Sequence, residues 1–90
     1  AQIMRDDLVA VDRALIALST GKGDAAETLE RLRVLVHDLK GSAGSFGFHF
    51  VSLVAECLYD LVAIIKTPEP RMLILLRDHR DSLEIACRTN

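Results

Sequence analysis

The chain has few of the residues that build sheets, disulfides or membrane spans. Its 90 residues include no tryptophan, aromatic side chains make up 4%, and its two cysteines form no C-x-x-C pair. The longest apolar runs, such as Leu61–Ile65 and Met72–Leu76, have five residues, whereas a membrane helix needs about 20. We therefore expect no membrane span, reduced packing thiols at Cys57 and Cys87, and a cytoplasmic location.

A strong charge of one sign is also lacking. The chain has 11 Lys and Arg residues and 13 Asp and Glu residues, which gives a formal net charge of -2. Acids and bases alternate in stretches such as 77–81, so no basic patch forms there. Nucleic-acid binding depends on such a patch, and the sequence therefore indicates no nucleic-acid partner.

Aliphatic residues dominate the apolar half of the chain and favour an all-α fold. Apolar side chains recur at spacings of three and four in four segments, about 2–20, 24–46, 50–66 and 68–88. A chain of this length buries only one core. The sequence therefore predicts a single domain over residues 1–90, folded as an antiparallel up-down four-helix bundle.

Capping residues separate the helical segments. Asp24 stands three residues before Glu27 and predicts a capping box at the start of the second helix, and Gly47 predicts its end. Thr67 is the expected N-cap of the fourth helix, with Pro68 in its first turn. The core-facing stripe of the second helix is expected to be Leu29, Leu32, Val36, Leu39, Ala43 and Phe46.

His37 falls outside this stripe, about 140° from Leu32 on a helical wheel, and therefore points away from the core. Lys40 follows by three residues and is close enough along the helix to share a bound anion with His37. Gly41 and Gly44 lie on the same face, although each costs a helix about 1 kcal/mol relative to alanine. Bare positions there would let a partner's backbone approach the imidazole. Alternatively, the helix ends near Lys40 and the glycines form a loop.

These residues belong to the segment 37–48, which reads HDLKGSAGSFGF. The segment closely resembles the signature of histidine phosphotransfer (HPt) domains: His-x-x-Lys-Gly, then small residues, an apolar residue and Gly. The four helical segments extend the resemblance over essentially the whole chain. It implies a phosphoryl carrier of two-component phosphorelays that has no kinase active site of its own. His37 would accept and donate the phosphoryl group, and Lys40 would stabilise it.

The resemblance also implies the partners, which are receiver domains of response regulators, a hybrid histidine kinase, or both. The domain itself is expected to be a monomer without a cofactor or a metal site. Magnesium would come with the receiver, because the nearest carboxylate, Asp38, lies about 100° from His37 on the wheel and is expected to point elsewhere. The surface that docks the partner is expected to include Arg33, Val34, Gly41, Gly44, Ser45 and Phe48.

Two residues are candidates to orient the imidazole. If the second and third helices form a hairpin that turns near Phe48, Tyr59 lies level with His37, and Glu56 lies one turn away. The family commonly has Gln or Glu at this level, so Tyr59 is a departure. Its hydroxyl would bond the ring, or the tyrosine would simply pack at the edge of the core with its hydroxyl in water. Glu56 is the alternative hydrogen-bond partner of the ring.

Other functions fit the sequence less well. A metal-binding bundle would pair ligands on one helix face, but His37, His49 and His79 form no Glu-x-x-His or His-x-x-x-His motif. We expect His49 at the surface and His79 partly buried. The glycines of segment 41–47 lack the Gly-Lys-Ser/Thr ending of a P-loop. The phosphoacceptor domain of a chemotaxis-type histidine kinase and a non-catalytic adaptor on the same fold remain as alternatives.

Overall fold

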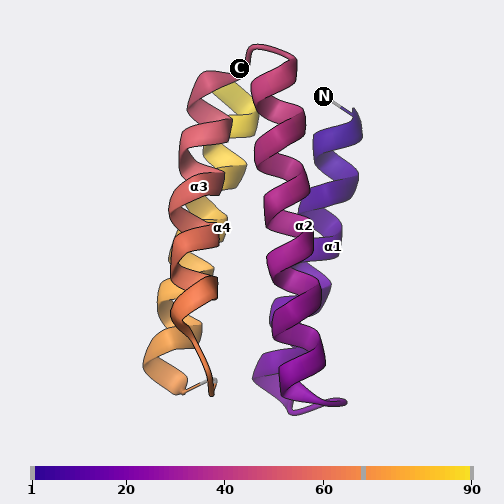
Figure 1. Cartoon of the computed structure of the whole chain (residues 1–90), viewed down its shortest axis with the longest axis vertical. Helices are drawn as coiled ribbons and strands as arrows, with labels where there is room; N and C mark the ends of the chain where they lie inside the picture. Colours follow the sequence, from indigo (N-terminus) through magenta and orange to yellow (C-terminus); the bar gives the residue numbers. More distant parts are fainter. Residues whose placement is uncertain (1, 68, 90) are drawn as a thin grey trace.

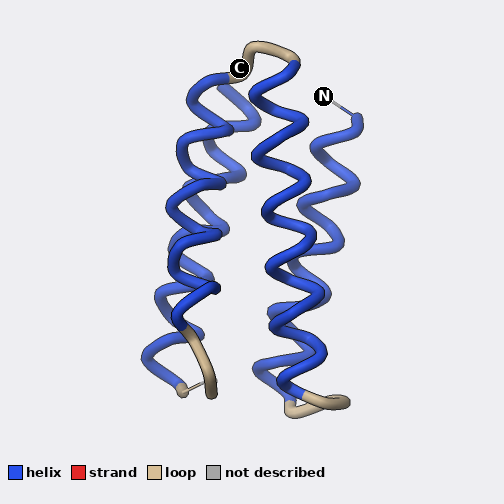
Figure 2. Tube along the Cα trace, viewed as in Figure 1, coloured by secondary structure: helices blue, strands red, loops and turns tan. Residues whose placement is uncertain are grey.

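The computed structural model describes residues 2–67 and 69–89. Its helices are α1 (Gln2–Thr20), α2 (Ala25–Ser45), α3 (His49–Ile64) and α4 (Pro70–Thr89). They run alternately up and down, with the α2–α3 turn at one end and the α1–α2 and α3–α4 connections at the other (Figure 1). The described residues between them are turns and loops (Figure 2). The predicted all-α antiparallel four-helix bundle is therefore confirmed.

The four helices close a ring in which each helix packs against two neighbours. α1 packs on α2, α2 on α3, α3 on α4, and α4 on α1, while the described parts of the diagonal pairs make no close backbone contact. The contact between α2 and α3 is the most extensive. No described helix is both long enough and apolar enough to cross a membrane.

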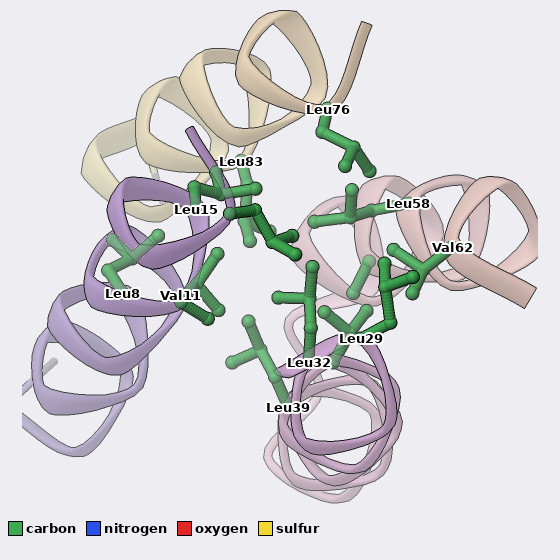
Figure 3. Close-up of a cluster of buried hydrophobic side chains, with 14 of the residues drawn as sticks. Leu8, Val11, Leu15, Leu29, Leu32, Leu39, Leu58, Val62, Leu76 and Leu83 are labelled. Carbon is green, nitrogen blue, oxygen red and sulfur yellow. The ribbon is translucent and has the colours of Figure 1, made fainter. Parts of the chain in front are cut away.

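The core is aliphatic and receives side chains from all four helices (Figure 3). Among the described side chains, Thr28 is the only buried polar one, and its hydroxyl donates to the Asp24 carbonyl at 3.0 Å. Full burial of one Leu, Ile or Val side chain stabilises a fold by roughly 1.5–3 kcal/mol. The largest fully buried side chains are Val11, Leu29, Leu32, Val36, Leu39, Val51, Leu58, Val62, Ile65, Leu76 and Leu83.

An ion-pair network joins α1 to α4. The Arg80 guanidinium donates to both carboxylate oxygens of Asp12 and, at 2.7 Å, to Glu84. The hydrogen bond to Asp12 is the main cause that raises the pKa of Arg80 above its ordinary value. Glu84 also accepts from Arg88 at 2.9 Å, and these bonds lower the pKa of its carboxyl. The network ties the first helix to the last along the α1–α4 side of the bundle.

The start of α2 is capped by Asp24, as the sequence predicts. Its Oδ1 accepts from the backbone N–H of Ala26 at 2.8 Å and of Glu27 at 3.4 Å. The carboxylate also carries the sign of charge that a helix N-terminus favours. In the described structure, no reciprocal bond from the Glu27 side chain completes the capping box.

The end of α2 is a Schellman motif. Gly47 adopts a φ of 80° and donates to the Gly44 carbonyl at 3.1 Å, while Phe48 donates to the Ala43 carbonyl at 2.8 Å. The predicted role of Gly47 as the stop is confirmed. α2 runs without a break to Ser45, so the alternative in which Gly41 and Gly44 form a loop is wrong.

Two apolar residues lie differently from the prediction. Phe46 is not part of the core stripe but is 63% exposed, because it is the C-cap, where the backbone leaves the helix. Cys57 is an exposed free thiol, because it directly precedes the inward-facing Leu58 on α3. Cys87 is half-buried against the core, and burial raises the pKa of its thiol.

The start of α4 also differs from the prediction. The helix begins at Pro70, and its first bond runs from the Leu73 N–H to the Glu69 carbonyl at 3.0 Å. Thr67 is therefore not its N-cap. Proline suits the first helical position because it has no N–H to leave unpaired, and it disfavours a helical conformation in the residue before it. Pro68, which the sequence placed in the first turn, lies outside the described residues.

Replacement by alanine is expected to lower the free energy of unfolding at Gly47 and to raise it at Gly41. Gly47→Ala places a Cβ at a left-handed φ and should reduce the free energy of unfolding by about 1–2 kcal/mol. Gly41→Ala removes a glycine from a helix, where a new Cβ would meet nothing within 4 Å, and should increase the free energy of unfolding by up to about 1 kcal/mol. Urea denaturation midpoints measure both changes. Stabilisation by Gly47→Ala would contradict the proposed role of the motif.

Candidate functional site

The candidate site lies where α2 and α3 run side by side in opposite directions (Figure 1). The ring centroids of His37 and Tyr59 are 5.7 Å apart, with the ring planes inclined at 58°. One turn further along α2, the Nζ of Lys40 lies 3.7 Å from the Oε1 of Glu56. Lys40 follows His37 by three residues on α2, and Glu56 precedes Tyr59 by three residues on α3, as in antiparallel helices. The structure thus places Tyr59 level with His37, as the hairpin argument predicts.

His37 is open to solvent. Its side chain is 68% exposed, and it lies in the middle of a continuous helix whose inward stripe ends at Ala43. The Oδ1 of Asp38 is 3.7 Å from the His37 Nδ1, so the expectation that Asp38 points away from the imidazole is wrong. The two side chains belong to successive residues and both extend into solvent, which allows them to approach despite their separation on the wheel. The other ring nitrogen, Nε2, has no partner among the described residues.

Neither candidate for orienting the imidazole forms a hydrogen bond to it in the described structure. Tyr59 contacts His37 through its ring and is half-buried against the core. Glu56 pairs with Lys40 instead of His37. The geometry therefore matches the packing alternative for Tyr59, and it gives Glu56 a different neighbour from the one the sequence suggested.

The two glycines on the His37 side of α2 are not required by packing inside the domain. A Cβ built on Gly41 would meet no atom within 4 Å. One built on Gly44 would meet only the Oγ of Ser52, at 3.6 Å, which is an ordinary contact. Both residues are exposed. Their cost to helix stability is therefore not offset by close packing within the fold, and the surface beside His37 is left bare.

Arg33, one turn before His37, is committed to contacts within the bundle. Its Nη2 donates to the Ile65 carbonyl at 3.0 Å and its Nε to the Val62 carbonyl at 3.3 Å. These are carbonyls at the end of α3, where a cation is favourable for the helix dipole. Its Nη1 donates to Glu30 at 2.9 Å. Arg33 therefore fixes the end of α3 against α2.

The other residues expected to dock a partner differ in exposure. Val34 is 51% exposed and lines a shallow hollow beside His37 and Tyr59. Ser45 is exposed at the end of α2. Phe48 is half-buried and packs against the core, so only part of its ring faces outward.

Ser52 is a residue of the site that the sequence argument missed. Its hydroxyl donates to the Lys40 carbonyl at 3.2 Å, and its Oγ is the atom nearest to a Cβ built on Gly44. The hairpin turn at Phe48 would have indicated it, because Ser52 lies four residues after the turn and Gly44 four before. Ser52 therefore extends the α2–α3 contact beyond Lys40 towards the turn.

The charges around the site are mostly acidic. On the α1 side, the pKa of Asp7 is raised mainly by burial and further by the carboxylates of Asp6 and Asp38. On the α3 side, Glu56 faces Lys40. In the described part of the chain, no three His, Cys, Asp or Glu side chains gather as a possible metal site. His49 is exposed at the start of α3, and the half-buried His79 contacts the Leu75 carbonyl through its Nδ1 at 2.8 Å.

A comparison with family models agrees with this geometry. The model of the Hpt domain matches residues 2–85. The chain therefore belongs to the Hpt domain family, which confirms the resemblance carried by segment 37–48. Proteins of this family are phosphocarrier modules that take part in histidine phosphotransfer and are not kinases. No curated protein and no solved structure matches the chain.

Replacement of Tyr59 distinguishes ring packing from hydrogen bonding. Tyr59→Phe should leave the ¹⁵N chemical shifts of the His37 ring unchanged, because the hydroxyl is not bonded to it. Tyr59→Ala should change them, because it removes a ring contact of the kind worth about 0.5–1.5 kcal/mol. Long-range ¹H–¹⁵N NMR spectra measure both. A large change in Tyr59→Phe would mean that the hydroxyl orients the imidazole.

Proposed function

We propose that this chain carries a phosphoryl group on His37, which it accepts from the aspartyl phosphate of one receiver domain and donates to another. The observation that carries the proposal is the pairing of an exposed His37 with Lys40 on the next turn, beside two glycines that internal packing does not require. A nucleophile, a cation and a bare surface are what group transfer between docked proteins requires.

The chemistry proposed for His37 is nucleophilic displacement at phosphorus. The nucleophile is the neutral imidazole, because only an unprotonated ring nitrogen has a free electron pair. As a ring nitrogen forms the N–P bond, the bond from phosphorus to the aspartyl oxygen breaks, and the carboxylate leaves with the electron pair. The proton on the other ring nitrogen passes to solvent as the ring returns to neutrality. The return reaction reverses these steps.

The role proposed for Lys40 is electrostatic. Phosphoryl transfer depends mainly on in-line positioning and on stabilisation of the charge on the equatorial oxygens. Lys40 lies one turn from His37 on the α3 side of α2, and its side chain is 39% exposed, so the ammonium can move towards a bound phosphoryl group. Magnesium belongs to the receiver in this proposal, because the described carboxylates near His37 do not gather as a ligand set.

The docking surface proposed here surrounds His37 on α2 and α3. Val34 supplies exposed apolar area, and Gly41, Gly44 and Ser45 present little side chain to a partner. Arg33 acts indirectly in this proposal, since its guanidinium is bonded to α3. A receiver would therefore approach the side of the bundle rather than its end.

The assignment of His37 is tested by phosphorylation with phosphoramidate and with labelled receivers. His37→Gln should abolish acid-labile labelling while the free energy of unfolding stays within about 0.5 kcal/mol, because the position is exposed. His49→Gln is the matched control, since His49 is also an exposed helical histidine. His49→Gln should label as the wild type does, and acid-labile label retained in His37→Gln would refute the proposal.

Gly44 tests the docking surface separately from the chemistry. Gly44→Leu should weaken receiver binding by about tenfold or more, equivalent to roughly 1.4 kcal/mol, because a large side chain would fill the approach to His37. Helix stability should rise, since leucine is the better helix former. Ser82→Leu, at an exposed position on α4, is the control for added apolar surface. Equal binding by both variants, measured by titration calorimetry, would place the docking surface elsewhere.

A further inference from the structure

Lys40 already has a partner before any phosphoryl group arrives. Its ammonium lies 3.7 Å from the Glu56 carboxylate, and the two side chains are 39% and 50% exposed. The backbone of the same lysine is tied to α3, because Ser52 donates to its carbonyl at 3.2 Å. The ion pair with Glu56 is therefore not the only contact that holds Lys40 against α3, since Ser52 also bonds its backbone.

Few other cations are available to a phosphoryl group on His37. Arg33 is the other described cation on the same side of α2, and its guanidinium is bonded to two carbonyls of α3 and to Glu30. Asp38 adds a negative charge 3.7 Å from the imidazole. Glu30, Arg33 and Tyr59 line the hollow beside His37, and Asp38, Lys40 and Glu56 make the contacts described above. On the α1 side, Asp7 lies near enough to Asp38 for that carboxylate to raise the pKa of Asp7, after burial and Asp6.

We propose that Glu56 is a positioning residue that holds the Lys40 ammonium in the unphosphorylated domain and competes with the phosphoryl group for it. The inference rests on the proposed function of His37. A phosphoryl group adds a charge of about -1.5 to -2 near pH 7, which exceeds the single charge of Glu56, so Lys40 turns towards it. Glu56 then loses its counter-ion and repels the new charge.

The competition has a thermodynamic consequence for transfer. Glu56 raises the free energy of the phosphohistidine relative to the free imidazole, so it favours forward transfer of the phosphoryl group to a receiver. Ion pairs between exposed side chains are weak, because water and salt screen them. The expected effect of Glu56 is therefore about two- to fivefold, enough to bias the equilibrium without blocking acceptance.

The test uses ³¹P NMR of the domain phosphorylated with phosphoramidate. The phosphoryl group titrates with an ordinary second pKa of about 6, and a nearby negative charge raises this pKa by disfavouring the dianion. Glu56→Gln should therefore lower the pKa, so that the phosphoryl group binds its proton about two- to fivefold more weakly. In 1 M salt the difference should shrink, because the Debye length falls to about 3 Å.

Asp60→Asn is the matched control. Asp60 is an exposed acid on α3, four residues after Glu56, and no ion pair joins it to Lys40 in the described structure. Loss of the Asp60 charge should change the proton affinity of the phosphoryl group less than Glu56→Gln does. Melting followed by circular dichroism checks that both variants stay folded.

The outcomes separate this inference from the function on which it rests. If the wild-type domain takes no phosphoryl group on His37, both are overturned. If His37 is labelled but Glu56→Gln and Asp60→Asn give equal proton affinities, the role of Glu56 alone is overturned. Slower acceptance by Glu56→Gln, with the phosphoryl pKa unchanged, would return Glu56 to orienting the imidazole and would also overturn it. A salt-sensitive decrease in the pKa of the phosphoryl group that occurs only in Glu56→Gln supports the role of Glu56.

Discussion

The antiparallel contact between α2 and α3 is the constraint on which the candidate site depends. The Schellman motif at Gly47 sets where the chain reverses, and the bonds of Arg33 to the end of α3 hold the far end of the hairpin. Between them, the contacts of His37 with Tyr59 and of Lys40 with Glu56 follow from the register. A slip of one residue would turn each helical position by about 100° and separate both pairs. The aliphatic core opposes such a slip as well, because the same rotation would carry the inward stripe of α2 out of the core.

The glycines within α2 and the glycine that follows it differ in what they contribute to the stability of the fold. Gly47 is needed by the fold, because its φ of 80° is a conformation that side chains disfavour. Gly41 and Gly44 have no such need, and each weakens the helix by about 1 kcal/mol relative to alanine. Large domains absorb such costs easily, whereas a 90-residue bundle has a small margin of stability. Under the proposed function, the approach of a receiver to His37 explains why these two positions are bare.

Much of this architecture could be predicted from the sequence, because helix periodicity, the Asp24 cap and the Gly47 stop are local signals. The position of the turn was enough to predict that Tyr59 lies level with His37. The interactions of Glu56 and Asp38 did not, because long exposed side chains choose among several partners and a helical wheel gives only their direction. The start of α4 was misplaced because two prolines stand close together, and either one suits a first turn.

The exposed imidazole lies on one side of the bundle, eight residues before the last residue of α2, about 12 Å along its axis at 1.5 Å per residue. If His37 is the single acceptor and the surface around it docks both receivers, a donor and an acceptor cannot occupy the domain together. Under the proposed function, exchange must then follow ping-pong kinetics, in which the first receiver departs before the second arrives. The lifetime of the free phosphorylated domain, rather than that of any ternary complex, would set how long a signal persists between the two encounters.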